Sequence, residues 1–273
     1  MSRLVVCLLL VAALTACTGG NDEPSAEPTP TPSSSAPAPP TATAVPPPDD
    51  RACYALDYDQ AVAPTSDEHP VDCQDDHTSM TFAVGRLHTV VGGHLLAVDS
   101  DRVQAQVAQT CPDRLAGFVG GTVEARRLSM LRAVWFTPTV EQSDAGASWF
   151  RCDVIALAGD EKLAPLTGKV AGVLDKSAGQ ERYGMCGTAE PGTPRFARVI
   201  CSDQHSWRAI ATVPFRDGAY PGLEKVRAAG DTPCQDAARA VAADTLNFQW
   251  GYEWPTAAQW DAGQTYGLCW APD

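Results

Sequence analysis

Two segments of the chain share a spacing of cysteine, aspartate and histidine that could carry chemistry. Residues 73–77 and 201–205 both read Cys-x-Asp-x-His. An imidazole beside a carboxylate could act as a general base. The same pair could instead cap the turn after the cysteine, and we favour this interpretation because a base also needs a nucleophile or a substrate cleft beside it. His77 and His205 are therefore predicted to be possible binding residues.

The first segment also has the spacing of a zinc site. His69, Cys73 and His77 follow one another at regular intervals, so their side chains could converge on Zn²⁺. The second segment has no counterpart of His69, however, and a cysteine in a disulfide is not a thiolate ligand. We therefore predict no metal ion and no other cofactor.

The usual motifs of catalysis are missing from the sequence. It contains no Gly-x-Ser-x-Gly, no phosphate-binding loop, no His-Glu-x-x-His, no glycine-rich dinucleotide turn and no Cys-x-x-Cys. We predict no catalytic residue and a protein that is not an enzyme. The alternative is an envelope glycan-acting hydrolase, or a small-ligand-binding enzyme, that uses His77 or His205.

Tryptophans are concentrated near the end of the chain. Trp250, Tyr252 and Trp254 alternate along a predicted strand and would share one face, and Trp260 follows closely. Aromatic side chains anchor protein interfaces and stack on sugars, but they also fill cores. We favour core packing, and we expect Trp250, Trp254 and Trp260 to contribute to binding only where their rings are exposed.

These residues occur in a duplicated order. Residues 138–152 and 255–269 align without a gap, and both contain Pro-Thr, Gln, Asp-Ala-Gly and a closing cysteine. The two Cys-x-Asp-x-His segments and the remaining cysteines repeat in the same order upstream. The sequence therefore predicts two domains, 51–160 and 181–273, joined by a linker at 161–180.

Each predicted domain contains four cysteines. They are Cys53, Cys73, Cys111 and Cys152 in the first, and Cys186, Cys201, Cys234 and Cys269 in the second. An even number in an exported chain is typical of a disulfide framework, and four cysteines allow three pairings in each half. We favour first with second and third with fourth, because the third lies in a helix-like run that must pack on the strand of the fourth.

The hydrophobic pattern of each half mixes strands with helices. Strands are predicted at 80–87, 131–136, 196–201, 207–213 and 248–254. A helical face runs from Val103 to Phe118, and Pro112 should break it into two pieces. A second helix should start near Pro233. The expected class is α+β, with two tandem disulfide-stapled domains, each a small antiparallel sheet with helices on one side.

The N-terminal residues predict export, a lipid anchor and a tether. A basic start and an apolar run end in Leu14-Thr15-Ala16-Cys17, which indicates a lipoprotein signal peptide at 1–16. Cys17 would then carry the lipid, palmitate included, at the outer face of the cytoplasmic membrane. A plain secretory signal with a chance cysteine is the alternative. Residues 17–50 are rich in Pro, Ser and Thr and are expected to form a disordered linker.

Composition narrows the range of partners. The 273 residues include 20 basic and 33 acidic side chains, which give a formal charge of −13. We predict no nucleic-acid partner, because no basic stretch could neutralise phosphates. No apolar run reaches the length of about 18 residues that a transmembrane helix needs. The expected partners are the membrane, through Cys17, and an envelope protein or glycan.

The motifs together resemble the septum-formation domain family, whose small extracytoplasmic domains occur mostly on membrane-anchored proteins and lipoproteins of high-GC Gram-positive bacteria. The matching closing segment consists of Trp254, Pro255, Thr256, Trp260, Gly263 and Cys269. Ser143 stands in the first half where Trp260 stands in the second, which departs from the family pattern. The resemblance covers most of residues 51–273 as two copies. It implies a binding or scaffold role at the cell envelope, linked to septum formation and cell division, and it brings no known reaction.

Overall fold

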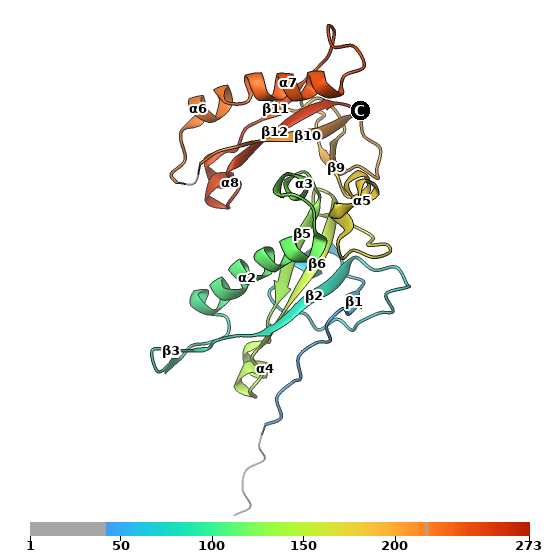
Figure 1. The fold of residues 1–273 in the computed structure, drawn as a ribbon. Coiled ribbons are helices and arrows are strands. Elements are labelled where there is room, and N and C mark those ends of the chain that lie inside the picture. Colours follow the sequence, from blue (N-terminus) through green and yellow to red (C-terminus); the bar gives the residue numbers. More distant parts are fainter. Residues whose placement is uncertain (1–41, 217) are drawn as a thin grey trace, which may run out of the picture. The chain divides into compact units, whose positions relative to one another are not determined.

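The computed structural model of the chain describes residues 42–216 and 218–273, which form two similar halves within one unit (Figure 1). Cys17 and the predicted signal peptide lie outside the described residues. Residues 42–50 of the expected linker contain no helix or strand. Among the described residues, no helix combines the length and the apolar character needed to span a membrane.

The first half alternates short strands with helices. In chain order it contains β1 (Cys53–Tyr54), α1 (Tyr58–Val62), β2 (Ser79–Arg86), β3 (Val90–Val91), β4 (His94–Leu95), α2 (Asp101–Val119), α3 (Val123–Arg127), β5 (Leu131–Phe136), α4 (Val140–Asp144), β6 (Trp149–Gly159) and β7 (Lys162–Ala164). The connection to the second half contains a 3-10 helix, η1 (Val173–Asp175), and α5 (Ser177–Arg182).

The second half repeats this order with fewer elements. It contains β8 (Met185–Gly187), β9 (Arg198–Ile200), β10 (Trp207–Pro214), α6 (Leu223–Ala228), α7 (Asp231–Val241), β11 (Gly251–Glu253), α8 (Ala257–Asp261) and β12 (Tyr266–Pro272). The strand predicted at 248–254 is thus shorter than expected.

Each half is built on an antiparallel sheet, and the two sheets have the same topology. The strand order is β1-β2-β6-β5 in the first sheet and β8-β10-β12-β11 in the second, with β7 and β9 added at different places. A register shift interrupts β2 between Thr81 and Ala83, and an equivalent shift interrupts β10 between Ala209 and Ala211. The structure thereby confirms the predicted α+β class.

The Pro-Thr and Asp-Ala-Gly residues of the repeat form a short capped helix in both halves. Thr139 begins α4 and Thr256 begins α8, and each accepts a hydrogen bond from the backbone of a glutamine three residues later. The glutamine side chain returns a bond to the threonine backbone, which completes a capping box. Gly146 and Gly263 then adopt φ values of 101° and 93°, a region that favours glycine.

The prediction that Pro112 breaks the first long helix is wrong. Helix α2 continues through Pro112 to Val119. Proline cannot donate to the carbonyl of Ala108 one turn earlier, so it weakens the helix locally. Burial on both sides of the proline holds the helix together, because Val103, Val107, Cys111 and Val119 all lie in the core.

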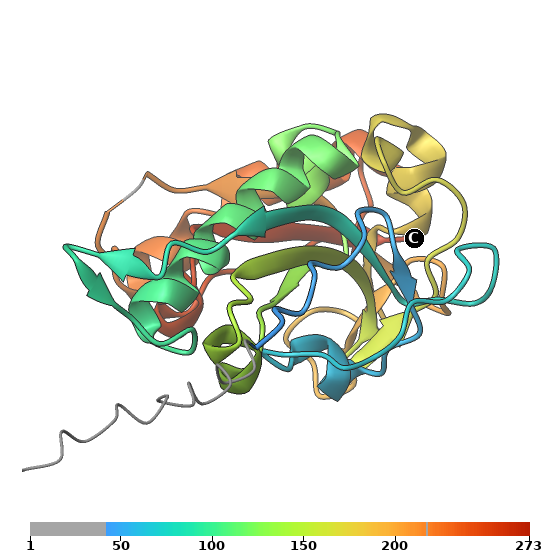
Figure 2. The ribbon, with the colours of Figure 1, turned by 90° about the horizontal axis from the view of Figure 1, so that it is seen from below.

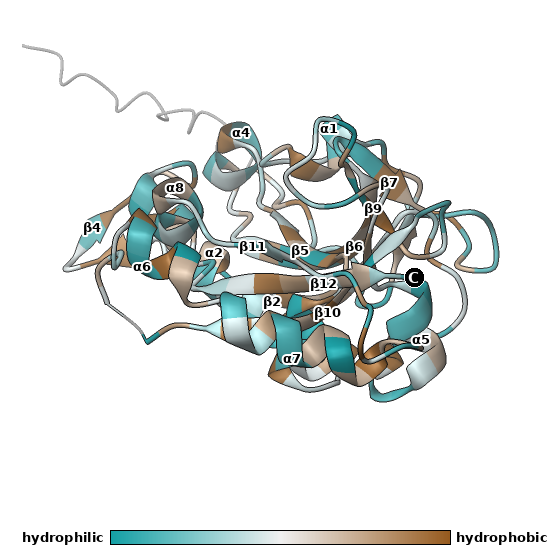
Figure 3. Cartoon of the chain, turned by 90° about the horizontal axis from the view of Figure 1, so that it is seen from above, coloured by the Kyte–Doolittle hydropathy of each residue, from teal (hydrophilic) through white to brown (hydrophobic). Residues whose placement is uncertain are grey.

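One main helix packs on each sheet, and the first sheet has a further small helix on its other side. Helix α2 packs on the first sheet and α7 on the second, where α7 lies at the surface above β10 and β12 (Figure 3). The small helix α1 lies on the other side of the first sheet, away from α2 (Figure 2). Its residue Ala61 packs with Phe136 and Ile155, whereas Cys152 and Val154 belong to the α2 side.

One hydrophobic cluster extends through both halves. It includes Val107 and Val154 from the first half and Leu268 and Trp270 from the second. The segment 161–180, expected to be a linker, contributes Leu166, Val170 and Leu174 to this cluster. The connection between the halves is therefore part of the core.

On the face of each sheet that does not carry the main helix, one aligned position is polar in the first half and apolar in the second. In the first half, Ser79 and Thr81 donate hydrogen bonds to the buried Asp153 at 2.9 and 2.8 Å. Asp153 also lies 3.4 Å from the buried Arg151, but burial outweighs these contacts and raises the pKa of Asp153. In the repeat alignment, the counterpart of Asp153 is Trp270, which lies in the shared core.

Four disulfides join the cysteines in the pairs that the sequence analysis favours. They are Cys53–Cys73, Cys111–Cys152, Cys186–Cys201 and Cys234–Cys269. In each half, the second bridge fastens the main helix to the closing strand. The first bridge fastens the first strand of each half, β1 or β8, to the turn that holds the histidine.

Candidate functional site

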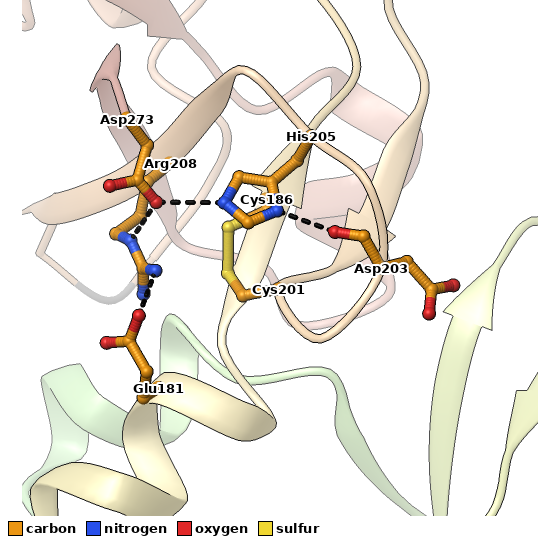
Figure 4. Close-up of polar contacts among 7 residues, drawn as sticks. All are labelled: Glu181, Cys186, Cys201, Asp203, His205, Arg208 and Asp273. Atoms are coloured by element: carbon orange, nitrogen blue, oxygen red, sulfur yellow. Dashed lines mark hydrogen bonds and ion pairs between the residues drawn. A yellow bond between two sulfur atoms is a disulfide. The ribbon is translucent and has the colours of Figure 1, made fainter.

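His205 lies in the turn that follows β9 and has acceptors on both of its ring nitrogens (Figure 4). Its Nδ1 is 2.7 Å from the backbone oxygen of Asp203, and its Nε2 is 2.9 Å from a carboxylate oxygen of Asp273. A backbone carbonyl and a carboxylate can only accept, so each ring nitrogen faces an acceptor to which it donates when it carries a proton. The ring is thus held in place rather than left free to take a proton from a substrate.

Arg208 extends this contact into a chain of charges. Its Nε donates to the same Asp273 oxygen at 2.7 Å, and its Nη2 donates to Glu181 of α5 at 2.6 Å (Figure 4). Partial burial raises the pKa of Asp273, but the hydrogen bonds from Arg208 and His205 outweigh it, so the pKa lies below its usual value. The network therefore joins α5 to the end of β12 through β10.

The described residues bring possible metal ligands together at one place. Potential ligand atoms of Cys186, His205 and Asp273 lie within 4.8 Å of one another. Cys186 is bonded to Cys201, however, so its sulfur is not a thiolate. Both ring nitrogens of His205 already lie within hydrogen-bond distance of an acceptor, so neither faces an open coordination position. This donor set does not fit a metal ion.

His77 occupies the equivalent turn of the first half but is enclosed. Its side chain is 2% exposed, and its Nδ1 lies 2.9 Å from the backbone oxygen of Asp75. Its Nε2 is buried without a hydrogen-bond partner among the described residues. A ligand in solvent cannot reach this ring, which argues against the predicted binding role of His77.

The aspartates of the Cys-x-Asp-x-His turns act through their backbones. The interpretation that the Asp75 and Asp203 carboxylates pair with the histidines is wrong, because the backbone carbonyls take that place. The candidate zinc ligands do not form one donor set, because Cys73 is in a disulfide, His69 is exposed and His77 is buried.

Trp260 is a core residue, as core packing of the late aromatics predicted. It is 6% exposed and lies between Phe215 and Tyr220, with both ring centroids 5.7 Å away. Its Nε1 donates to the backbone oxygen of Gly218 at 2.8 Å. A buried and hydrogen-bonded indole offers nothing to a partner, so the possible binding role of Trp260 is not supported.

Trp250 and Trp254 are both partly buried. Trp250 packs with Tyr252 against the cluster of Val213, Cys234 and Cys269 under α7. Trp254 lies beside Tyr252, and the guanidinium of Arg227 lies 5.1 Å from its ring centroid. These two tryptophans remain accessible enough to contact a partner, though most of their surface serves packing.

The structure also contains a cleft that the sequence analysis missed. It has a volume of about 540 Å³ and lies between α2, α3 and β5 of the first half and α8 and β12 of the second. Three arginines line it, Arg126, Arg127 and Arg132, together with Tyr266. The only sequence signal was an arginine doublet, with a third arginine nearby, in an acidic chain.

Comparison with known proteins identifies the family of the chain. A family model described as septum formation matches it twice, at residues 25–141 and 127–269. No curated protein and no solved structure matches the chain. The two family matches agree with the repeated strand order of the two sheets. Since they extend together over most of the chain, the protein belongs to the septum-formation family and carries its domain in two tandem copies.

Proposed function

We propose that the protein is an extracytoplasmic lipoprotein that binds a partner at the cell envelope during septum formation. The observation that carries this proposal is the double match to the septum-formation family. The lipid on Cys17 would hold the chain to the outer face of the cytoplasmic membrane. Eight cysteines in four disulfides are consistent with an oxidising compartment outside the cytoplasm.

Membrane attachment would depend on the acyl chains at Cys17. The net charge of −13 opposes binding to anionic headgroups, so charge attraction would not replace the lipid. Residues between Cys17 and the first strand are rich in proline and would separate the folded unit from the membrane. This arrangement favours a partner in the envelope over a partner in the bilayer.

The arrangement of the histidines favours binding over catalysis. His77 is enclosed, and both nitrogens of His205 already have acceptors. A general base needs a free nitrogen within reach of a substrate proton. Neither histidine therefore offers a free base to the glycan hydrolase alternative.

Localisation tests the proposed role directly. A chain with an epitope tag after Asp273 should concentrate at division sites, and cells that lack it should form septa late or in the wrong place. A C17A variant should incorporate no labelled palmitate and should lose membrane attachment, whereas a C7A variant should retain both. Uniform distribution of the tagged protein, together with normal septa in its absence, would argue against the division role.

A second experiment addresses catalysis. Purified protein incubated with isolated envelope glycan should release no new reducing ends. The matched variant H205N keeps a side-chain donor and removes the imidazole. Release by the wild type that disappears in H205N would establish the hydrolase and overturn the non-enzymatic proposal.

A further inference from the structure

We propose that the arginine-lined cleft between the two halves binds the carboxylate group of a ligand with an apolar body. The cleft lies between α3 and β5 on one side and α8 and β12 on the other. Its volume of about 540 Å³ is in the range of small-molecule sites. This site is independent of the role in septum formation, since its ligand can be tested without any division phenotype.

Arg132 presents the edge of its guanidinium that suits a carboxylate. Its Nη1 donates to the backbone oxygens of Ser129 and Leu131 at 2.8 and 2.7 Å. No described residue accepts from Nε or Nη2, and neither atom is enclosed. These two donors form the fork that binds a carboxylate through two parallel hydrogen bonds.

Arg126 and Arg127 add positive charge from the last turn of α3. Arg126 donates through Nη1 to the backbone oxygens of Gly120 and Gly121. The guanidinium carbon of Arg127 lies 4.4 Å from the centroid of the Tyr266 ring. Both side chains are thus fixed in position by contacts that leave their charge uncompensated.

No carboxylate balances this charge within the cleft. Among the described residues that line it there is no aspartate or glutamate, and none of the three arginines forms an ion pair. Elsewhere in the same acidic chain, Arg198 pairs with Glu253 and Arg208 with Asp273. Burial, with a smaller contribution from Arg198, lowers the pKa of Arg132, as expected for a partly buried cation without a counter-charge.

The remaining surface of the cleft favours an apolar group beside the anion. The apolar lining residues are Pro112, Leu115, Ala116, Val119, Val123, Leu131, Ala133 and Ala262. A polyanion would extend beyond the cleft, where an acidic chain with a net charge of −13 repels it. A single carboxylate with an aliphatic body can place its one charge among the three arginines. The geometry therefore points to a small amphipathic monoanion.

Nuclear magnetic resonance of the full chain in nonionic detergent tests this site. With ¹⁵N-labelled arginine, sodium hexanoate should shift the Nε–Hε signal of Arg132 in a saturable manner. Hexanamide, which has the same aliphatic body without the charge, should not. An R132Q variant should weaken hexanoate binding about tenfold or more, as expected for the loss of one charged hydrogen-bonding fork. The exposed Arg102 provides the matched control, because R102Q should bind hexanoate like the wild type.

The wild-type titration decides the outcome even where R132Q folds poorly. An Arg132 signal that hexanoate leaves unmoved, or that hexanamide moves equally, would overturn the proposal. Inorganic phosphate at the same ionic strength provides the third arm. Saturable shifts with phosphate that equal or exceed those with hexanoate would assign the site to phosphate and overturn the carboxylate. Septal localisation is unaffected by any of these results, so a failure here is distinct from a failure of the proposed function.

Discussion

The guanidinium carbon of Arg127 lies 4.4 Å from the centroid of the Tyr266 ring, and this stacking joins α3 of the first half to β12 of the second. A second contact lies nearby, where Glu124 of α3 accepts a hydrogen bond from the backbone of Thr212 in β10 at 2.8 Å. The short helix α3 is therefore held by the second sheet although it belongs to the first half.

The stacking of Arg127 on Tyr266 should contribute measurable stability. R127M and Y266L should each lower the free energy of unfolding, and a double-mutant cycle should give a coupling of about 0.5–1 kcal/mol. Urea unfolding followed by circular dichroism measures each corner. Arg239 stacks on Phe248 instead, so the pair R239M and Y266L should show no coupling. Equal coupling in both cycles would mean that the effect is not specific to this contact.

Trp270 should be essential to both halves because it lies in the cluster that they share. It is fully buried, so W270A should lower the free energy of unfolding by about 3–5 kcal/mol. Near-ultraviolet and far-ultraviolet circular dichroism should report a single coincident transition in the wild type. W254A is the matched control and should cost much less, since Trp254 is only partly buried. Two separate transitions in the wild type would contradict a common core.

Pro112 should cost stability at its position within α2. P112A restores the backbone N–H and should raise the free energy of unfolding by about 1–3 kcal/mol. Pro233 is the matched control, because it lies in the first turn of α7, where a backbone N–H has no partner within the helix. P233A should change stability little or lower it slightly. A loss of stability in P112A would show that α2 is bent to suit the proline.

Tyr252 should make the protein sensitive to alkaline pH. Burial and the nearby Asp231 raise the pKa of Tyr252 to about 12, above the value near 10 in the unfolded chain. The unfolded state therefore loses this proton first, and stability falls as pH rises above about 10 until the folded pKa is reached. The urea midpoint of the wild type should drop more steeply between about pH 10 and 12 than that of Y252F.

The repeated order of motifs was sufficient to predict the shared topology of the halves. The sequence predicts structure well where the same residue recurs at the same place in both halves, as Thr139 and Thr256 do at the helix caps and as the cysteines do. The pairing of the cysteines could be predicted because the helix that contains Cys111 must pack on the strand that contains Cys152. Pro112 misled the prediction because local propensity was outweighed by tertiary burial on both sides of it.

Contacts between the halves could not be read from either half alone. The cleft arginines have no regular spacing, and Tyr266 reaches them only after the second sheet has packed on α3. Asp153 and Trp270 occupy aligned positions of the repeat. Nothing in the sequence around them indicates that Asp153 joins a buried polar cluster whereas Trp270 joins the core shared by both halves. For the histidines, spacing predicted the turn, but it could not tell a backbone acceptor from a carboxylate.

The four bridges pair the eight cysteines of the folded unit in sequence order, the first with the second, the third with the fourth, and so on. A polypeptide that enters an oxidising space with its N-terminus first would expose each native partner before any competitor. Out of about a hundred ways to pair eight thiols, vectorial translocation would select the native set by order of arrival. Such a chain would mature with a simple oxidase and would not depend on an isomerase to correct its pairings.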